Sequence, residues 1–314
     1  MKPLRPQVGL IVFLALLTAP LPSSQQRFRS STDAVLVDVQ VLAGGKPVSG
    51  LTAADFELKD SGVRQDIQVA SFADVPISLL LALDVSASVE GERLERLTAA
   101  AREAVDALRP GDQAAVLTFR DRVQLHADWT SDRAALRTRL GELKAAGWTA
   151  LYDAVFSAVS LREKAAGRVV VLVFSDGIDT ASWLDATAAI EAARRSDVVI
   201  TAVSAAERVQ PSSAREARLA LGLDAHLRRW FDTDPSLFPY AFFEVLTAQS
   251  GGQLLHVSSD EQLAPAFRRI VDEFKTRYLL TFAPKGVPPD GWHPIDVSLK
   301  RIRGDVKARR GYWR

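Results

Sequence analysis

Hydrophobic and polar positions divide this chain into three parts with different periods. In residues 31–75 hydrophobic residues recur at every second position in short runs, as in 34–41, and turn residues such as those at 44–47 separate the runs. A period of two is typical of antiparallel strands joined by tight turns. These strands are too few to bury a core of their own. They therefore need a partner from elsewhere in the chain.

From Val75 to about Arg277 strand-like runs alternate with segments of helical period. Strands are predicted at 77–84, 113–119, 122–127 (an edge strand), 168–174, 197–203 and 253–257. Helices are predicted at 94–108, 131–143, 150–163, 185–195, 238–248 and 261–276. Such alternation predicts an α/β domain with a doubly wound, mainly parallel sheet that is covered on both faces.

Residues 278–314 return to a strand pattern at 278–284, 293–300 and 305–309, with no helix between these runs. Both ends of the chain thus carry strands without a complete core. The simplest arrangement pairs 31–75 with 278–314 in one small antiparallel, β-sandwich-like module. The α/β domain, residues 76–277, would then be inserted in that module.

The first 24 residues have the outline of a secretory signal peptide. A basic start with Lys2 and Arg5 precedes an apolar core from Val8 to Ala19 and a small polar exit. An uncleaved membrane anchor is the alternative, but a spanning helix needs about 20 apolar residues. The chain contains no cysteine, so neither a disulfide nor a lipid-modified Cys is available. We expect a secreted, periplasmic or cell-envelope bacterial protein with no stable membrane span after cleavage.

The composition is that of an ordinary globular protein. The chain has 314 residues, of which 47% are hydrophobic and 25% charged, enough for one large and one small domain. Its formal charge is +1, from 39 basic and 38 acidic residues, and loss of Lys2 and Arg5 with a leader would make it −1. This balance gives no reason to expect binding to nucleic acid or to an anionic membrane surface.

Oxygen-bearing side chains follow two of the predicted central strands. One strand ends in Asp84, followed by Ser86 and Ser88, and another is followed by Asp176, while Thr149 directly precedes an apolar helix. Because the carboxyl ends of parallel strands meet at one edge of a sheet, we expect these side chains to converge there. Alternation along an extended segment would point Asp84 and both serines in a common direction.

Hydroxyl and carboxylate oxygens favour Mg²⁺, Mn²⁺ or Ca²⁺, and no Cys or His is present in the set to favour zinc. Mg²⁺ is the first expectation. Each piece also has an ordinary interpretation, because Ser and Thr149 are common helix caps and Asp176 followed by glycine is common in turns. The three pieces in this order favour a metal site. Asp153 and Asp179 are open to two interpretations, as support for the site or as helix-capping or solvated residues.

Two tryptophans flank the predicted site in the sequence. With Asp179, Trp148 and Trp183 are candidates for a ligand-binding rim, since exposed tryptophan anchors partners, but a buried tryptophan at the base of a loop is the alternative. A further stretch, 205–235, is either a recognition insert or a solvated helix. Its basic residues are Arg215, Arg218, Arg228 and Arg229.

The predicted metal site resembles the metal-ion-dependent adhesion site (MIDAS) of the von Willebrand factor type A domain. The residues that carry this resemblance are Asp84, Ser86, Ser88, Thr149 and Asp176. The resemblance implies that Ser86, Ser88 and Thr149 bind the metal directly. It implies that Asp84 and Asp176 bind it directly or through water. A Glu or Asp of a partner protein would complete the coordination shell.

The resemblance extends beyond the site. The order and spacing of elements are similar to that family over 76–277, which implies a Rossmann-like fold. The flanks, including the residues 48–51, 55–56 and 308–312, are similar to von Willebrand factor A-related proteins of the Acidobacterial type. We therefore expect an exported, adhesion-type protein-binding module that depends on a divalent cation.

The sequence lacks the common signatures of enzymes. It has no Gly-x-Ser-x-Gly elbow, no phosphate-binding loop and no His-Glu-x-x-His motif. Ser86 stands where an Asp-x-Asp pair would need its second carboxylate. Its four histidines are scattered: His126, His226, His256 and His293. We expect a binding protein and no enzyme; a metal-dependent hydrolase and a structural envelope protein with a vacant site are the alternatives.

Overall fold

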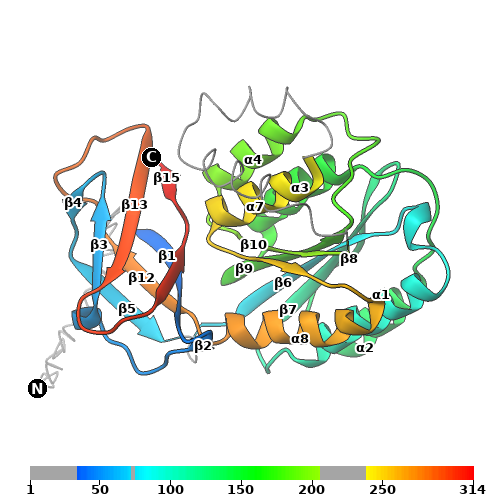
Figure 1. Cartoon of the computed structure of the whole chain (residues 1–314), viewed down its shortest axis with the longest axis horizontal. Coiled ribbons are helices and arrows are strands. Elements are labelled where there is room, and N and C mark those ends of the chain that lie inside the picture. The colour runs from blue at the N-terminus through cyan, green and yellow to red at the C-terminus, as the bar shows by residue number, and fades with distance from the viewer. Residues whose placement is uncertain (1–33, 72–74, 206–237) are drawn as a thin grey trace, which may run out of the picture. The chain divides into compact units, whose positions relative to one another are not determined.

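The α/β part of the protein is built on one six-stranded sheet (Figure 1). The computed structural model describes residues 34–71, 75–205 and 238–314. The strands of this sheet are β6 (Ile77–Asp84), β7 (Gln113–Phe119), β8 (Val123–Thr130), β9 (Arg168–Ser175), β10 (Val199–Ser204) and β11 (Leu254–His256). Their order is β11-β10-β9-β6-β7-β8, and only the edge strand β8 is antiparallel to its neighbour.

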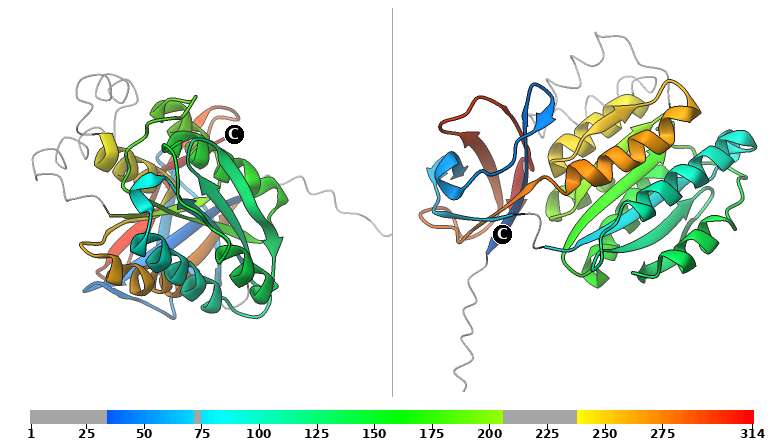
Figure 2. Two further views of the ribbon diagram at one scale, coloured as in Figure 1. Left: turned by 90° about the vertical axis from the view of Figure 1, so that its right-hand side faces the viewer. Right: turned by 90° about the horizontal axis from the view of Figure 1, so that it is seen from below.

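Helices cover both faces of this sheet (Figures 1 and 2). One face carries α1 (Glu92–Asp106), α2 (Arg133–Leu140) and α8 (Leu263–Phe274). The other carries α3 (Leu151–Ser160), α4 (Ala186–Arg195) and α7 (Phe238–Ser250). Side chains of β6 alternate between the two cores, with Leu81 and Leu83 on one face and Leu80 and Ala82 on the other. Burial on both faces is why this strand is hydrophobic at nearly every position.

Strands from both ends of the described chain form a second, antiparallel module. They are β1 (Val35–Ala43), β2 (Lys46–Pro47), β3 (Phe56–Asp60), β4 (Val63–Arg64), β5 (Ile67–Ser71), β12 (Tyr278–Phe282), β13 (Trp292–Leu299), β14 (Asp305–Ala308) and β15 (Gly311–Trp313). One sheet has the order β14-β1-β12-β5, with β2 on β1, and the other has the order β15-β13-β3-β4. We call these strands the β-module.

The two sheets of the β-module share one core, to which β1 contributes Val37 and Val39 and β3 contributes Phe56 and Leu58. The inserted position of the α/β elements follows from the pairing of β1 with β12 and of β3 with β13, whose partners lie on either side of them in the sequence. The predicted fold class is confirmed: a mainly parallel α/β sheet with an antiparallel β-module on its flanks.

Several elements differ in length from their predictions. The helix predicted at 131–143 is α2, which begins after Asp132 because the Asp132 carboxylate accepts hydrogen bonds from the N–H groups of Ala134 and Ala135. The strand predicted at 253–257 is the three-residue β11. Strand β15 was not predicted, because a three-residue strand is too short to show a period.

Two sequence predictions lie outside the described residues. They are the signal peptide, 1–24, and the insert, 205–235, of which only Ala205 is described. In 34–71, 75–205 and 238–314, no helix has both the length and the apolar character needed to cross a membrane.

The amino end of the α/β sheet adjoins the β-module. Arg168, the first residue of β9, forms a buried ion pair with Asp38 of β1, and Ile77 of β6 lies opposite Arg168 in the sheet. The guanidinium groups of Arg168 and Arg277 lie 4.7 Å and 5.3 Å from the ring centre of Phe274. Because the central strands are parallel, their carboxyl ends lie at the other end of the domain, which faces the viewer in the left panel of Figure 2.

Candidate metal centre

Asp84 is the last residue of β6 and is fully buried. Its Oδ1 accepts a hydrogen bond from the Ser86 N–H at 2.9 Å, and its Oδ2 accepts one from the Ser175 hydroxyl at 2.7 Å. Burial raises the pKa of Asp84 and outweighs the hydrogen bonds, which lower it; the negative charge of Asp176 adds to the rise. Buried charges are usually paired with an opposite charge or bound to metal. The groups that act on the Asp84 carboxylate are hydroxyls, a backbone amide and a second carboxylate, and none of these carries a positive charge.

The two serines of the motif lie in a short 3₁₀ turn, η3 (Ala87–Val89), for which Ser86 is the N-cap. Their hydroxyl oxygens are 3.1 Å apart, and the Ser88 hydroxyl lies 3.5 Å from Oδ2 of Asp176. The predicted alternation along an extended segment is wrong, because the chain turns after Ser86. The turn, and not the pleat of a strand, brings the two hydroxyls together.

Thr149 reaches the site on a separate loop. The N–H of Ala87 donates to the carbonyl of Gly147 at 3.0 Å, which ties this loop to the segment after β6. The interpretation of Thr149 as a helix cap is wrong, because Ala150 occupies the N-cap position of α3. The Thr149 N–H donates to the Thr180 hydroxyl at 2.9 Å, so the loop after β9 is held against it as well.

Four of the five predicted ligands surround one pocket. Ser86, Ser88, Thr149 and Asp176 line a cavity of about 440 Å³, and Asp84 adjoins it through its hydrogen bond to Ser86. The described ranges hold no cluster of three or more His, Cys, Asp or Glu side chains that could bind a metal. The donors gathered at this edge are instead two carboxylates and three hydroxyls, a set that suits a hard cation.

The architecture and this part of the sequence match a known domain family. Residues 79–178 match the von Willebrand factor type A domain. The match runs from β6 to just beyond β9, so it includes all five candidate ligands. The fold of the α/β part is vWA-like, and we use vWA domain below as a short label for it.

Solved structures that are similar to this chain have low sequence identity to it. A von Willebrand factor type A protein from Catenulispora acidiphila is 13% identical with a TM-score of 0.52, over 85% of this chain and 74% of that one. Proximal thread matrix protein 1 from the mussel byssus is 15% identical with a TM-score of 0.49, over 69% of this chain and 50% of that one. Another structure of the mussel protein, with a zinc-occupied MIDAS motif, is 16% identical with a TM-score of 0.49, over 68% and 49%. No curated protein matches the sequence.

Ser175 supports the site and was not predicted. Besides its hydrogen bond to Asp84, its hydroxyl accepts the N–H of Gly177 at 3.0 Å, which shapes the turn that carries Asp176. The sequence signal for it was present: Ser175 is a hydroxyl residue at the end of a central strand, directly before a predicted ligand.

Asp121 holds the loop that carries Thr149. Nothing in the sequence indicated this role, because Asp121 lies far from that loop along the chain. Its Oδ1 accepts the N–H of Trp148 at 2.9 Å. Gly147 has φ +77°, and a Cβ there would lie 2.0 Å from Oδ2 of Asp121. Only glycine fits this close approach, so the carboxylate and the glycine together set the path of the loop.

Asp179 and Asp153 resolve the two interpretations that the sequence left open. Asp179 Oδ1 accepts hydrogen bonds from the first two N–H groups of α3, at 2.8 Å and 3.3 Å, so it caps that helix. Asp153 accepts the N–H groups of Trp183 and Leu184, each at 3.0 Å. Asp179 does not line the pocket of the candidate ligands, and its carboxylate oxygens accept hydrogen bonds within the fold, while its rim role stays a prediction. Both aspartates anchor the loop 176–184 to α3.

Trp148 and Trp183 are exposed, at 67% and 95% of their surface. The alternative of buried tryptophans at the base of a loop is therefore wrong. Trp148 lines the pocket of the candidate ligands, whereas Trp183 lies further along the loop that follows Asp176.

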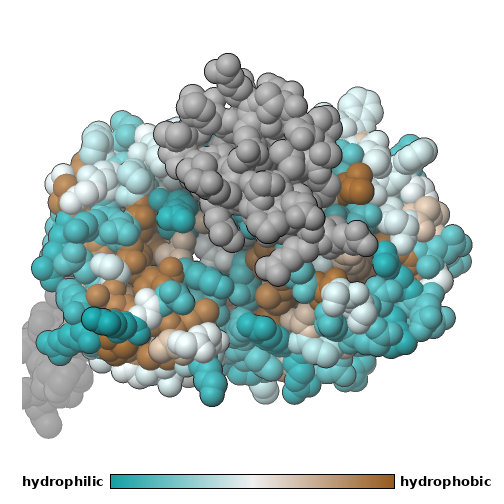
Figure 3. Space-filling view, viewed as in Figure 1, coloured by the Kyte–Doolittle hydropathy of each residue, from teal (hydrophilic) through white to brown (hydrophobic). Residues whose placement is uncertain are grey.

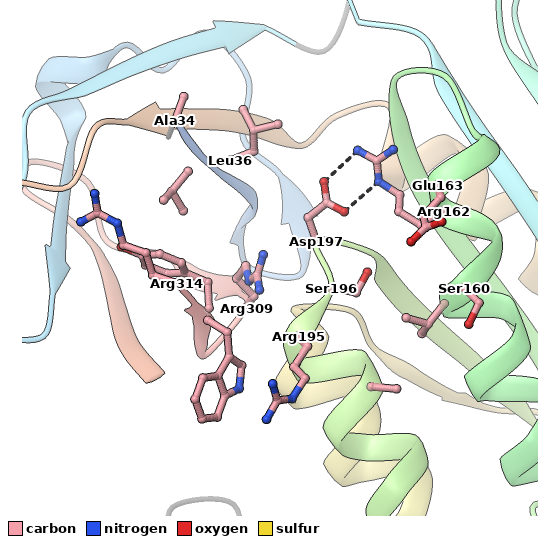
Figure 4. Close-up of a pocket in the computed structure, with 15 residues that line it drawn as sticks. Ala34, Leu36, Ser160, Arg162, Glu163, Arg195, Ser196, Asp197, Arg309 and Arg314 are labelled. Carbon is pink, nitrogen blue, oxygen red and sulfur yellow. Dashed lines mark hydrogen bonds and ion pairs between the residues drawn. The ribbon is translucent and has the colours of Figure 1, made fainter. Parts of the chain in front are cut away.

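A larger cavity, of about 780 Å³, lies at the amino end of the sheet, between the β-module and the ends of α3 and α4 (Figure 4). Three of its charged side chains have partners there: Arg162 binds Asp197 through two hydrogen bonds of 2.7 Å and 2.9 Å, and Arg195 lies 4.3 Å from the ring centre of Trp313. This cavity is separate from the candidate metal centre, with which it shares no lining residue.

Proposed function

We propose that the vWA domain binds a divalent cation at the carboxyl edge of its sheet and, with that cation, captures an acidic side chain of a partner protein. Domains of this family often act in protein–protein interaction and adhesion. The observation that carries the proposal is the buried carboxylate of Asp84, which adjoins an open pocket of hydroxyls and a second carboxylate.

The residues at the pocket fit a hard cation. Ser86, Ser88 and Thr149 would hold it through neutral hydroxyl oxygens, and Asp84 and Asp176 would hold it directly or through water, as in a MIDAS. Oxygen ligands of this kind suit Mg²⁺ first, with Mn²⁺ or Ca²⁺ as alternatives. Two carboxylates balance a charge of +2 but do not fill its coordination shell. When bound, the cation would supply a position for a carboxylate oxygen of the partner.

The surroundings of the pocket favour binding over hydrolysis. Among the described residues that line it, Asp176 is the sole ionisable side chain. A metal-dependent hydrolase would need a separate general base beside the site. We therefore propose a non-enzymatic role.

We also propose that the protein is exported to the bacterial envelope or secreted. Residues 1–24 support this with the outline of a signal peptide. The flanking residues 48–51 and 308–312 support membership of the Acidobacterial type of von Willebrand factor A-related proteins.

Titration calorimetry with Mg²⁺ and Mn²⁺ tests the metal site. We expect one cation to bind per wild-type chain and none to bind to Asp84→Asn. Asp112→Asn is the matched control, because Asp112 is also a buried aspartate but its oxygens accept the N–H groups of Ile77 and Arg109 at the opposite end of the sheet. If Asp84→Asn binds the cation as tightly as the wild type does, the proposal is wrong.

A further inference from the structure

The most exposed large hydrophobic side chains of the described ranges lie on the loops of the candidate metal centre. Trp183 is 95% exposed, Trp148 67% and Ile178 51%. The next, Phe156 on α3, is 43% exposed. On the β-module, hydrophobic residues are visible at the left of Figure 3, but the most exposed large ones, Val63 and Ile302, reach only 39%. Scattered residues of that kind are ordinary, whereas two strongly exposed ones that line one pocket, with a third further along the loop that carries one of them, mark an interaction site.

Two of these side chains are walls of the pocket itself. Trp148 and Ile178 line it together with Ser86, Ser88 and Asp176. A group that reaches the hydroxyls must therefore pass beside an indole and an isoleucine side chain. We call Trp148, Ile178 and Trp183 the apolar rim.

Hydrogen bonds hold the backbone of the rim in place. The N–H of Trp148 donates to Asp121 at 2.9 Å, and that of Trp183 donates to Asp153 at 3.0 Å. The N–H of Ile178 donates to Asp176 at 3.0 Å. Because the loops are already anchored, a partner that buries these side chains orders little additional backbone, which favours affinity.

Charge restricts the kind of partner that fits. Asp176 lines the pocket and Asp84 adjoins it through its hydrogen bond to Ser86, so these two carboxylates repel an incoming carboxylate until a cation is bound. A carboxylate is therefore attracted only with the cation, while the rim offers apolar surface to its neighbours.

Resting on the proposed function, we infer that this rim selects protein segments in which the captured Asp or Glu stands next to an aromatic or aliphatic side chain. The cation recognises the carboxylate, and the rim recognises the adjacent apolar group. Large aromatic anchors at the centre of an interface dominate binding energy. Trp148, which lines the pocket, should contribute more than Trp183.

Synthetic hexapeptides with one Asp or Glu, flanked by Phe, Leu, Ala or Lys, are the probe. At saturating Mg²⁺, measured by fluorescence anisotropy, we expect Phe- and Leu-flanked peptides to bind on the order of tenfold tighter than Ala- and Lys-flanked ones. Trp148→Ala should remove that preference, and Trp183→Ala should reduce it. Ile302→Ala, at an exposed hydrophobic residue of the β-module, should leave it unchanged.

Mg²⁺ titration of the same variants separates the two proposals. We expect Trp148→Ala and Trp183→Ala to bind Mg²⁺ as the wild type does, which would place their loss of preference in the rim. A wild type that binds Mg²⁺ but binds all the peptides equally, or binds none, would overturn the rim and leave the metal site standing. A wild type that binds no Mg²⁺ would overturn the proposed function and the rim with it.

Discussion

The two ends of the vWA sheet differ in the partners of their buried charged side chains. At the amino end, Arg168 forms an ion pair with Asp38 of the β-module, and the Arg277 guanidinium donates to the carbonyl of Gly251. At the carboxyl end, the fully buried Asp84 has hydroxyl and amide partners instead. The contrast supports the proposed metal site, because a buried carboxylate that lacks an opposite charge within the fold favours a cation from solution.

Removal of the amino-end carboxylate should have the largest effect on stability. Asp38→Ala leaves the buried Arg168 without its carboxylate, and we expect the free energy of unfolding to fall by about 3–5 kcal/mol. Urea denaturation measures it. Glu103→Ala is the control, because it breaks an ion pair with Arg268 in which the side chains are 47% and 58% exposed, and should cost about 1 kcal/mol or less. Equal losses in the two variants would contradict the structural role of the amino-end pair.

Ser175→Ala should weaken metal binding without removing any candidate ligand. The Ser175 hydroxyl orients Asp84 and holds the turn of Asp176, and loss of such support typically lowers metal affinity about 10–100-fold. Calorimetry with Mn²⁺ measures the change. Ser160→Ala is the matched control, since that hydroxyl bonds only the carbonyl of Phe156 within α3. An unchanged affinity in Ser175→Ala would mean that Asp84 is not oriented for the metal.

The substitution Asp84→Asn should stabilise the metal-free protein. It removes an uncompensated buried charge while keeping the shape of the side chain, and each unit by which burial raises the pKa of Asp84 is worth about 1.4 kcal/mol. Thermal denaturation in the presence of a chelator measures this. A less stable variant would show that the charge of Asp84 is compensated inside the fold, as at the amino end.

The difference in stability between Asp84→Asn and the metal-free wild type should depend on pH. Because the pKa of Asp84 is raised in the folded state, its ionised form opposes folding, and this unfavourable effect grows as the pH rises through the folded pKa. The stability difference between Asp84→Asn and the metal-free wild type should therefore be largest at neutral pH and shrink towards about pH 4, the ordinary pKa of aspartate. Denaturant titrations at several pH values test this. A difference that widened on acidification would contradict it.

The sequence predicted the features that depend on local pattern. The central strands β6 and β9 were found because burial on both faces makes them hydrophobic throughout. Asp84 and Asp176 were found because polar residues follow those strands. The fold class and the set of candidate ligands were predicted from this pattern of hydrophobic and polar residues together with the family resemblance.

Features that depend on contacts between distant residues were not predictable. Neither the pair of Asp38 with Arg168 nor the contact of Asp121 with the Gly147 loop leaves a periodic trace in the sequence. For Asp179 the sequence offered helix capping as one interpretation but could not select it, because the capped helix α3 precedes Asp179 in the chain.

Crystals soaked in Mn²⁺ give a decisive test of the proposed metal site, because anomalous scattering locates the cation independently of its effect on binding. We expect one strong anomalous peak at the carboxyl edge of the vWA sheet, within bonding distance of the Ser86 and Ser88 hydroxyls, and no such peak in Asp84→Asn. A wild-type crystal without that peak, at a Mn²⁺ concentration that saturates the calorimetric titration, would contradict it.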